Sequence, residues 1–261
     1  MSDIPPDSEE RLVKSVERVR DLGEVFTPGK IVQDMLDLLP GEMWEPHPSP
    51  TFLEPSCGDG NFLVAILARK LESVAAAYKA GKLPAGTDGD ALVFHGIEAV
   101  SSIYAVDMSV DNVIGGTPGH EVGARERLLT VFANWCDDMV APHLNSRSTV
   151  RAVVQWIVNR NVIVGNMLAA NADGRPSGRD NMPLLEYAWK PATRTVSVTA
   201  TTFGAVMSAS VAKTKGVRSL FDMLTPDITW EGAALELRDA PIAETHPANI
   251  EARNGATQRT A

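Results

Sequence analysis

The chain has 261 residues, of which 44% are hydrophobic, and carries a formal net charge of −9 at pH 7. This length suffices for one sizeable domain with a full core, and no apolar run approaches the roughly 18 residues that a membrane span needs. The acidic balance argues against unaided, tight binding of nucleic acid, which usually requires a basic patch. DNA remains open as a substrate, because net charge says little about a single cleft.

The stretch MSDIPPDSEE at residues 1–10 is acidic and polar and does not resemble a secretory signal. Cys57 and Cys136, the two cysteines, lie far apart in sequence, which is typical of a reducing compartment without a disulfide framework. We therefore expect a cytoplasmic protein with no membrane partner.

Two helices are expected before the first strand. Residues 1–22 read as a polar tail and a helix. In the second helix, Thr27 can act as the cap and Pro28 suits the first turn. Its expected buried stripe is Ile31, Met35, Leu38 and Leu39.

Three short apolar segments, TFLE at 51–54, SIYAVD at 102–107 and NVIV at 161–164, alternate with helical patterns. Helices are expected at 61–80, 91–100, 121–139 and 149–160. This alternation predicts an α/β fold with a Rossmann-like parallel sheet in a domain at 23–170. Residues 171–239 are expected to add a strand pair and a helix, and residues 240–261 a disordered tail.

The segment EPSCGDGNF at 54–62 carries the strongest functional signal. Gly58 and Gly60 allow a sharp turn and a close approach to a ligand, and Glu54 ends a strand where open sheets bind ligands. The spacing is not that of a dinucleotide or P-loop motif, so the ligand need not be a phosphate. The alternative is an ordinary strand-to-helix turn.

Polar residues also end the next two strands. Asp107 is positioned to accept from two ribose hydroxyls, although it can equally cap the helix that follows. Asn166 offers an amide that suits an adenine edge, although a turn asparagine is the alternative.

Together these residues resemble the γ-type DNA methyltransferases, which use S-adenosylmethionine to methylate adenine N6 in restriction-modification systems and phages. The resemblance covers about residues 20–170 and implies a Rossmann-like sheet of the class I methyltransferase type in a truncated form. In this family, a "FTP" motif closes over the cofactor, the glycine loop holds its amino-acid end, and the two strand-end residues hold ribose and adenine. The cofactor-binding positions implied here are Phe26, Thr27, Pro28, Glu54, Pro55, Cys57, Gly58, Gly60, Asn61, Phe62, Asp107, Met108, Asn166 and Met167.

The chain departs from this family at the catalytic step. The Asp/Asn-Pro-Pro-aromatic motif that holds the flipped adenine is absent after the third strand. The nearest candidates are Asn181, Pro183 and Tyr187, for which a turn before a strand pair is the alternative reading.

Three functional hypotheses follow. The first is a DNA adenine-N6 methyltransferase. The second is a non-catalytic, cofactor-binding subunit or regulator that needs a specificity or catalytic partner chain. The third is a phage counter-defence enzyme that consumes S-adenosylmethionine without DNA. The five histidines lack metal-ligand spacing, so no metal is expected.

Overall fold

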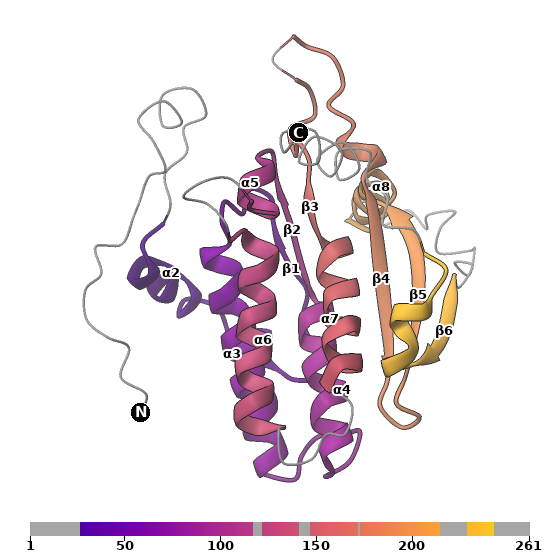
Figure 1. Ribbon diagram of the computed structural model, residues 1–261. Coiled ribbons are helices and arrows are strands. Elements are labelled where there is room, and N and C mark those ends of the chain that lie inside the picture. The colour runs from indigo at the N-terminus through magenta and orange to yellow at the C-terminus, as the bar shows by residue number, and fades with distance from the viewer. Residues whose placement is uncertain (1–26, 117–121, 141–146, 172, 215–228, 243–261) are drawn as a thin grey trace, which may run out of the picture.

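The structure is a computed structural model that describes residues 27–116, 122–140, 147–171, 173–214 and 229–242 (Figure 1). The expected tail and helix at 1–22, Phe26, and the end of the chain from residue 243 lie outside the described residues. None of the helices in these ranges is long and apolar enough to span a bilayer.

A three-stranded parallel sheet forms the centre of the molecule. Its strands are β1 (Phe52–Glu54), β2 (Ile103–Asp107) and β3 (Val162–Val164), in the spatial order β1-β2-β3. All three residues of β3 are buried, as is usual for strands of parallel sheets, which are covered on both faces. The prediction of an α/β fold with a parallel sheet is therefore confirmed.

The connecting helices cover one face of this sheet. They are α3 (Asn61–Lys79), α4 (Gly89–Ser101), α6 (Ala124–Met139) and α7 (Arg147–Asn161), and they lie in front of the strands in Figure 1. The short helix α5 (Val110–Val113) follows β2. Ile103, Ala105, Val162 and Val164 face these helices and join the same core as Leu67. The alternate strand residues point to the opposite face.

Helix α2 (Gly29–Leu36) precedes the 3₁₀ helix η1 (Gly41–Trp44), and its orientation differs from the expectation. Val32 and Leu36 are buried, and Leu39 is half-buried, whereas the remaining members of the predicted stripe are exposed: Ile31, Met35 and Leu38. The reason is a contact with α3. Arg69 of α3 donates to the Gln33 side chain and backbone carbonyl and pairs with Asp37 at 2.6 Å, which fixes the rotation of α2.

The chain after β3 forms a second sheet. The 3₁₀ helix η2 (Arg179–Asn181) leads into β4 (Pro183–Lys190) and β5 (Thr195–Thr202), and α8 (Phe203–Thr214) follows. The expected strand pair and helix are thus present. A third strand, β6 (Trp230–Ala233), and the 3₁₀ helix η3 (Ala234–Asp239) were not expected.

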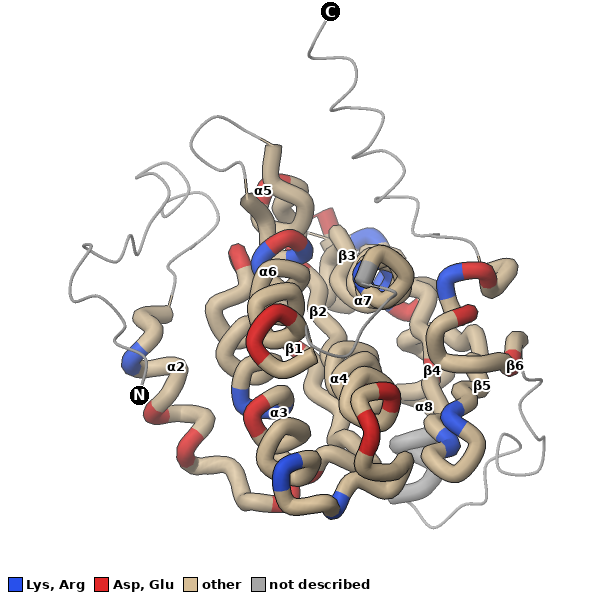
Figure 2. The backbone as a smooth tube through the Cα atoms, turned by 60° about the horizontal axis from the view of Figure 1, so that its bottom comes forward, with Lys and Arg blue, Asp and Glu red and all other residues tan. Residues whose placement is uncertain are grey.

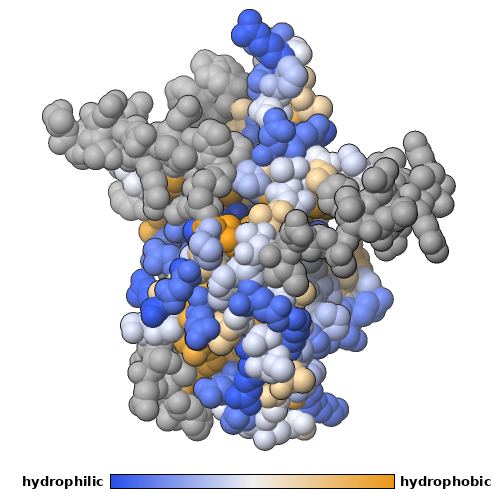
Figure 3. All heavy atoms as spheres, turned by 90° about the vertical axis from the view of Figure 1, so that its right-hand side faces the viewer, coloured by the Kyte–Doolittle hydropathy of each residue, from blue (hydrophilic) through white to orange (hydrophobic). Residues whose placement is uncertain are grey.

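This antiparallel sheet packs against α7 and α4, beside the parallel sheet, and the residues at its upper end cover part of the face that the connecting helices leave open. Val106 and Ile163 on that face are buried against Met182 and Phe203, and the Tyr104 hydroxyl donates to the Leu185 carbonyl. Leu185 and residues of β5 belong to the same core cluster as the helices. On the outer side of this sheet, hydrophilic residues predominate and hydrophobic ones show in narrow strips (Figure 3).

Gly60 marks the point where the loop after β1 meets α6. Its φ is +97°, and a Cβ at this position would lie 3.0 Å from the Ala124 Cβ. The position therefore requires glycine both for its left-handed backbone and for the close approach of α6.

We expect Gly60→Ala to destabilise the protein by about 2–4 kcal/mol, from backbone strain plus overpacking. Gly174 is the matched control, because its φ is +77° and an added Cβ would meet nothing within 4 Å. Gly174→Ala should cost only the strain, about 1 kcal/mol. Urea unfolding of both variants measures the difference, and equal losses would contradict the packing role of Gly60.

Candidate functional site

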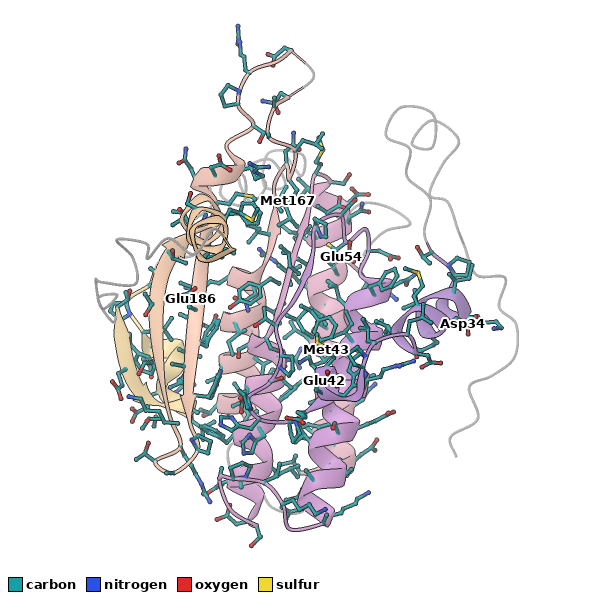
Figure 4. The ribbon with its side chains drawn as sticks, turned by 180° about the vertical axis from the view of Figure 1, so that it is seen from behind. Asp34, Glu42, Met43, Glu54, Met167 and Glu186 are labelled. Carbon is teal, nitrogen blue, oxygen red and sulfur yellow. The ribbon has the colours of Figure 1, made fainter. Side chains whose placement is uncertain are left out.

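A cavity of about 630 Å³ opens at the carboxyl ends of β1, β2 and β3. This volume lies within the range of small-molecule sites. Figure 4 shows Glu54 and Met167, which both line the cavity, at the same end of the parallel strands. The lining residues are Thr27, Glu54, Pro55, Ser56, Cys57, Gly58, Asp59, Asn61, Phe62, Asp107, Met108, Ser109, Asn112, Asn166, Met167 and Leu168.

The lining contains the described cofactor-binding candidates except Pro28 and Gly60. Three segments that are far apart in sequence thus converge, as expected when parallel strands end at one edge. Sequence reasoning missed Ser56, Asp59, Ser109, Asn112 and Leu168. Four of these flank the predicted motifs directly, and Asn112 lies on α5, five residues beyond Asp107.

Asp107 holds the edges of the cavity together. Its carboxylate accepts from the Gly58 N–H at 2.9 Å, the Ser109 N–H at 2.9 Å and the Asn112 amide at 3.0 Å. The residue is buried. A carboxylate offers about four acceptor sites, so capacity for a ligand hydroxyl remains after these three hydrogen bonds. The first role of Asp107 is therefore to fix the glycine loop against the end of β2.

Arg127 of α6 secures the other side of the glycine loop. Its guanidinium donates to the Asp59 carbonyl at 2.9 Å and to the Asn61 side chain at 2.8 Å, and pairs with the Asp59 carboxylate at 2.8 Å. The Asn61 amide in turn donates to the Thr27 carbonyl at 3.0 Å. Thr27 is not the helix cap that the sequence suggested, because Pro28 occupies that position without a side-chain cap bond.

The charged side chains that line the cavity are all acidic. They are Glu54, Asp59 and Asp107, and the described lining contains no lysine or arginine. Burial raises the pKa of the Glu54 carboxyl, although the Ser56 N–H opposes this shift. Because Arg127 pairs with Asp59, Glu54 and Asp107 are the lining acids that favour a cationic ligand over a phosphate.

Cys57 is not suited to nucleophilic chemistry. Its thiol is buried, and burial, together with the nearby Asp107 and Glu54 carboxylates, raises its pKa well above the ordinary value. The neutral thiol is a poor nucleophile. The side chain therefore packs the loop.

Asn166 takes part in local loop structure as well as facing the cavity. Its Oδ1 accepts from the Leu168 N–H at 2.9 Å, and its Nδ2 donates to the Asn171 side chain at 3.1 Å. These hydrogen bonds are those expected if Asn166 is a turn residue, which was the alternative to a contact with adenine. They also leave its amide oriented by protein groups rather than by a ligand.

The three catalytic candidates do not line the cavity. Asn181 is exposed in η2. Pro183 begins β4. The Tyr187 hydroxyl donates to Asn161 at 3.1 Å, beside the amino end of β3. The structure thus brings the predicted cofactor residues together and leaves the catalytic candidates elsewhere.

A second polar cluster, which sequence spacing did not indicate, links the 47–50 segment to α4. The Glu98 carboxylate lies 2.8 Å from both His47 Nδ1 and His95 Nδ1, and these three residues are close enough to hold a metal ion. However, the Ala85 N–H donates to His95 Nε2 at 3.3 Å, which places the His95 proton on Nδ1. A metal bound at Nδ1 would force the His95 proton onto Nε2, where it would point at the Ala85 N–H. Two donors would then face each other, so the geometry fits a hydrogen-bond network better than a metal site.

Comparison with known proteins gives no relative: no family model matches, and no curated protein or solved structure is significantly similar. The fold and site define an α/β protein with an acid-lined cavity at the carboxyl edge of a short parallel sheet. Inference about its function therefore depends on the residues of that cavity.

Lys70 lies beside the second cluster and is buried. Its ammonium donates to the Ser49 hydroxyl at 2.9 Å and the Pro50 carbonyl at 2.6 Å. Burial lowers the pKa of Lys70 from 10.5 to about 8, against the opposing effect of Glu98. Because the unfolded chain binds this proton more tightly, the Lys70 contribution to stability becomes more favourable as pH rises from about 8 to 10.5.

We expect Lys70→Met to remove that contribution, which amounts to about 3 kcal/mol across the window. The measurement is urea unfolding of the wild type and the variant at several pH values. Lys79→Met, at an exposed position at the end of α3, is the control and should keep the wild-type profile. A Lys70→Met profile parallel to that of the wild type would contradict the lowered pKa.

Proposed function

We propose that the cavity binds S-adenosylmethionine and that the protein is the cofactor-binding part of an adenine-N6 DNA methyltransferase of a restriction-modification or phage system. The observation that carries the proposal is the exclusively acidic charge of a cavity at the carboxyl edge of the sheet.

S-adenosylmethionine fits this chemistry because it is a nucleoside without phosphates and carries a sulfonium and an ammonium. Glu54 lies at the end of β1, where its carboxylate would accept from the ammonium of the zwitterionic amino-acid end of the ligand. The remaining acceptor capacity of Asp107 suits a ribose hydroxyl. A dinucleotide would instead place its phosphates beside the Glu54 and Asp107 carboxyl groups, which is unfavourable.

The bound cofactor would supply an electrophilic methyl group to the adenine amine. The residues of this chain contribute binding and orientation. Phe62, Met108 and Met167 give the cavity apolar surface beside its acids. Arg127 and Asp107 keep the glycine loop in place from two sides.

A specific observation favours the second hypothesis, that a partner chain completes the site. Asn181, Pro183 and Tyr187 lie outside the cavity, so none of these catalytic candidates would hold a flipped adenine there. Figure 2 shows residues of both charges interspersed over the described elements rather than a basic face. Both observations fit a cofactor-binding subunit whose partner grips the DNA.

The test is calorimetric titration with S-adenosylmethionine, followed by methyl transfer to mixed-sequence DNA with the same sample. Binding with transfer supports a complete enzyme, and binding without transfer supports the subunit. Cofactor breakdown without DNA would support the third hypothesis, an S-adenosylmethionine-consuming enzyme. Absence of binding would overturn the proposal.

We expect Glu54→Gln to weaken S-adenosylmethionine binding by about 1.5–3 kcal/mol, or roughly tenfold to a hundredfold in Kd, because a charge-assisted contact is lost. For the wild type, affinity should fall as pH decreases through the raised pKa of Glu54, above the ordinary value of 4.5. The variant should lack this dependence.

Glu72→Gln, which removes the same charge from an exposed position on α3, is the matched control in these titrations. It should bind S-adenosylmethionine like the wild type at every pH. An unchanged affinity and pH profile in Glu54→Gln would exclude a direct contact between Glu54 and the ligand.

A further inference from the structure

Strand β1 is the edge of the parallel sheet, and one side of it is uncovered by the described residues. Strands of parallel sheets are usually buried on both faces. Leu53, at the centre of β1, is nevertheless 45% exposed. An exposed apolar side chain on such a strand marks a surface that another chain can cover.

The backbone of β1 also has hydrogen-bonding groups that point outward. The Phe52 N–H donates to the Ser102 carbonyl at 2.9 Å, so Phe52 and Glu54 direct their backbone groups toward β2. The N–H and C=O of Leu53 therefore point to the free edge. Within the described part of the chain, no backbone or side-chain group bonds to them.

The antiparallel sheet leaves this part of the helix-free face open. Glu186 follows Leu185, whose carbonyl accepts from the Tyr104 hydroxyl of β2, and burial together with the nearby Glu186 carboxylate raises the pKa of Tyr104. Beyond Tyr104, Leu53 is the next residue across the sheet. Figure 4 shows this face with Glu186 on one side of the strands and Met43 and Glu42 on the other. We call the set Glu42, Met43, Leu53, Glu54 and Glu186 the β1 edge surface.

The charge of this surface indicates the kind of partner. Its three ionisable residues, Glu42, Glu54 and Glu186, are acidic, and the chain as a whole carries −9. A second copy would place like charges opposite one another, which is destabilising. A basic strand complements the same surface and belongs to the kind of protein that grips DNA.

The position of the cavity indicates the direction of the added strand. The carboxyl ends of all parallel strands meet at one edge, and ligands bind where connections diverge to opposite faces. In the described residues, both connections run in the same direction, from β1 toward β3, so no connection diverges to the other side of β1. A strand added beside β1 and parallel to it would end next to Glu54, and its following loop would enter the cavity.

We propose that the β1 edge surface docks a strand of a basic partner protein, parallel to β1, whose following loop completes the cavity. The inference rests on the proposed function, because it names the partner that this function lacks. Main-chain hydrogen bonds to Leu53 and apolar contact with its side chain provide the affinity, and the acidic residues provide the selectivity.

The test uses a defined probe, a fluorescein-labelled peptide of alternating valine and threonine with lysines at both ends and a benzophenone at its carboxyl end. Fluorescence polarisation should show saturable binding to the full chain. The same peptide with glutamates in place of lysines, and one methylated on its edge-facing amides, should not bind. Photo-crosslinks should form at the cavity, at Met108 or Met167, if the strand is parallel.

Two variants test the surface. Leu53→Glu should weaken peptide binding by about tenfold or more, and Glu186→Lys by several-fold. Met207→Glu changes a Met of α8 that is 46% exposed, and it should bind like the wild type. Because Glu186 is exposed, its variant remains informative if Leu53→Glu fails to fold.

Three outcomes would overturn the proposal. The peptide does not bind, Leu53→Glu and Glu186→Lys both bind it as tightly as the wild type does, or the crosslinks form away from the cavity. Dimerisation that Leu53→Glu abolishes would assign the edge to a second copy instead. S-adenosylmethionine titration of the same samples separates the two ideas. Cofactor binding without peptide binding would contradict the docking surface alone. Peptide binding without cofactor binding would contradict the proposed function.

Discussion

The hydrogen bonds of the Asp107 carboxylate are the constraint on which the site depends. Burying a carboxylate is costly unless its oxygens are bonded, and here Gly58, Ser109 and Asn112 provide three donors. The same bonds tie the loop after β1 to the turn after β2. The loop has few internal bonds, among them that from the Gly60 N–H to the Cys57 carbonyl, so its shape is imposed by β2 and not by its own sequence alone.

The character of the cavity follows from how the loop is held. Arg127 approaches the loop from α6 and pairs with Asp59, so its positive charge stabilises the loop and offsets that of Asp59, although Arg127 itself is not part of the lining. Glu54 lacks such a basic partner among the described residues, and its burial raises its pKa. The result is a preformed cavity with acidic walls, in which a cation gains more than it would in water.

The sequence predicted those parts of the structure that depend on local pattern. The apolar spacing in α3 and the short runs of β1, β2 and β3 determined the order of elements, and the edge of the sheet then placed Glu54, Asp107 and Asn166 together. Contacts between distant segments were not predictable in this way. Arg69 set the rotation of α2, and Ala85 set the tautomer of His95. Neither contact leaves a periodic signal, because each partner is an isolated residue.

The layout of the sheet links these local findings to the proposed role. Because the strands are added in one direction from β1 to β3, all their connecting helices cover one face (Figure 1). Met182, just before β4, and Phe203, at the start of α8, cover β2 and β3 on the other face. Among the described residues, the edge at Leu53 stays open, directly below Glu54 and the cavity. A cavity at the carboxyl edge of the sheet, catalytic candidates that lie elsewhere, and an exposed strand edge beside the same cavity form the geometry expected of the proposed cofactor-binding subunit.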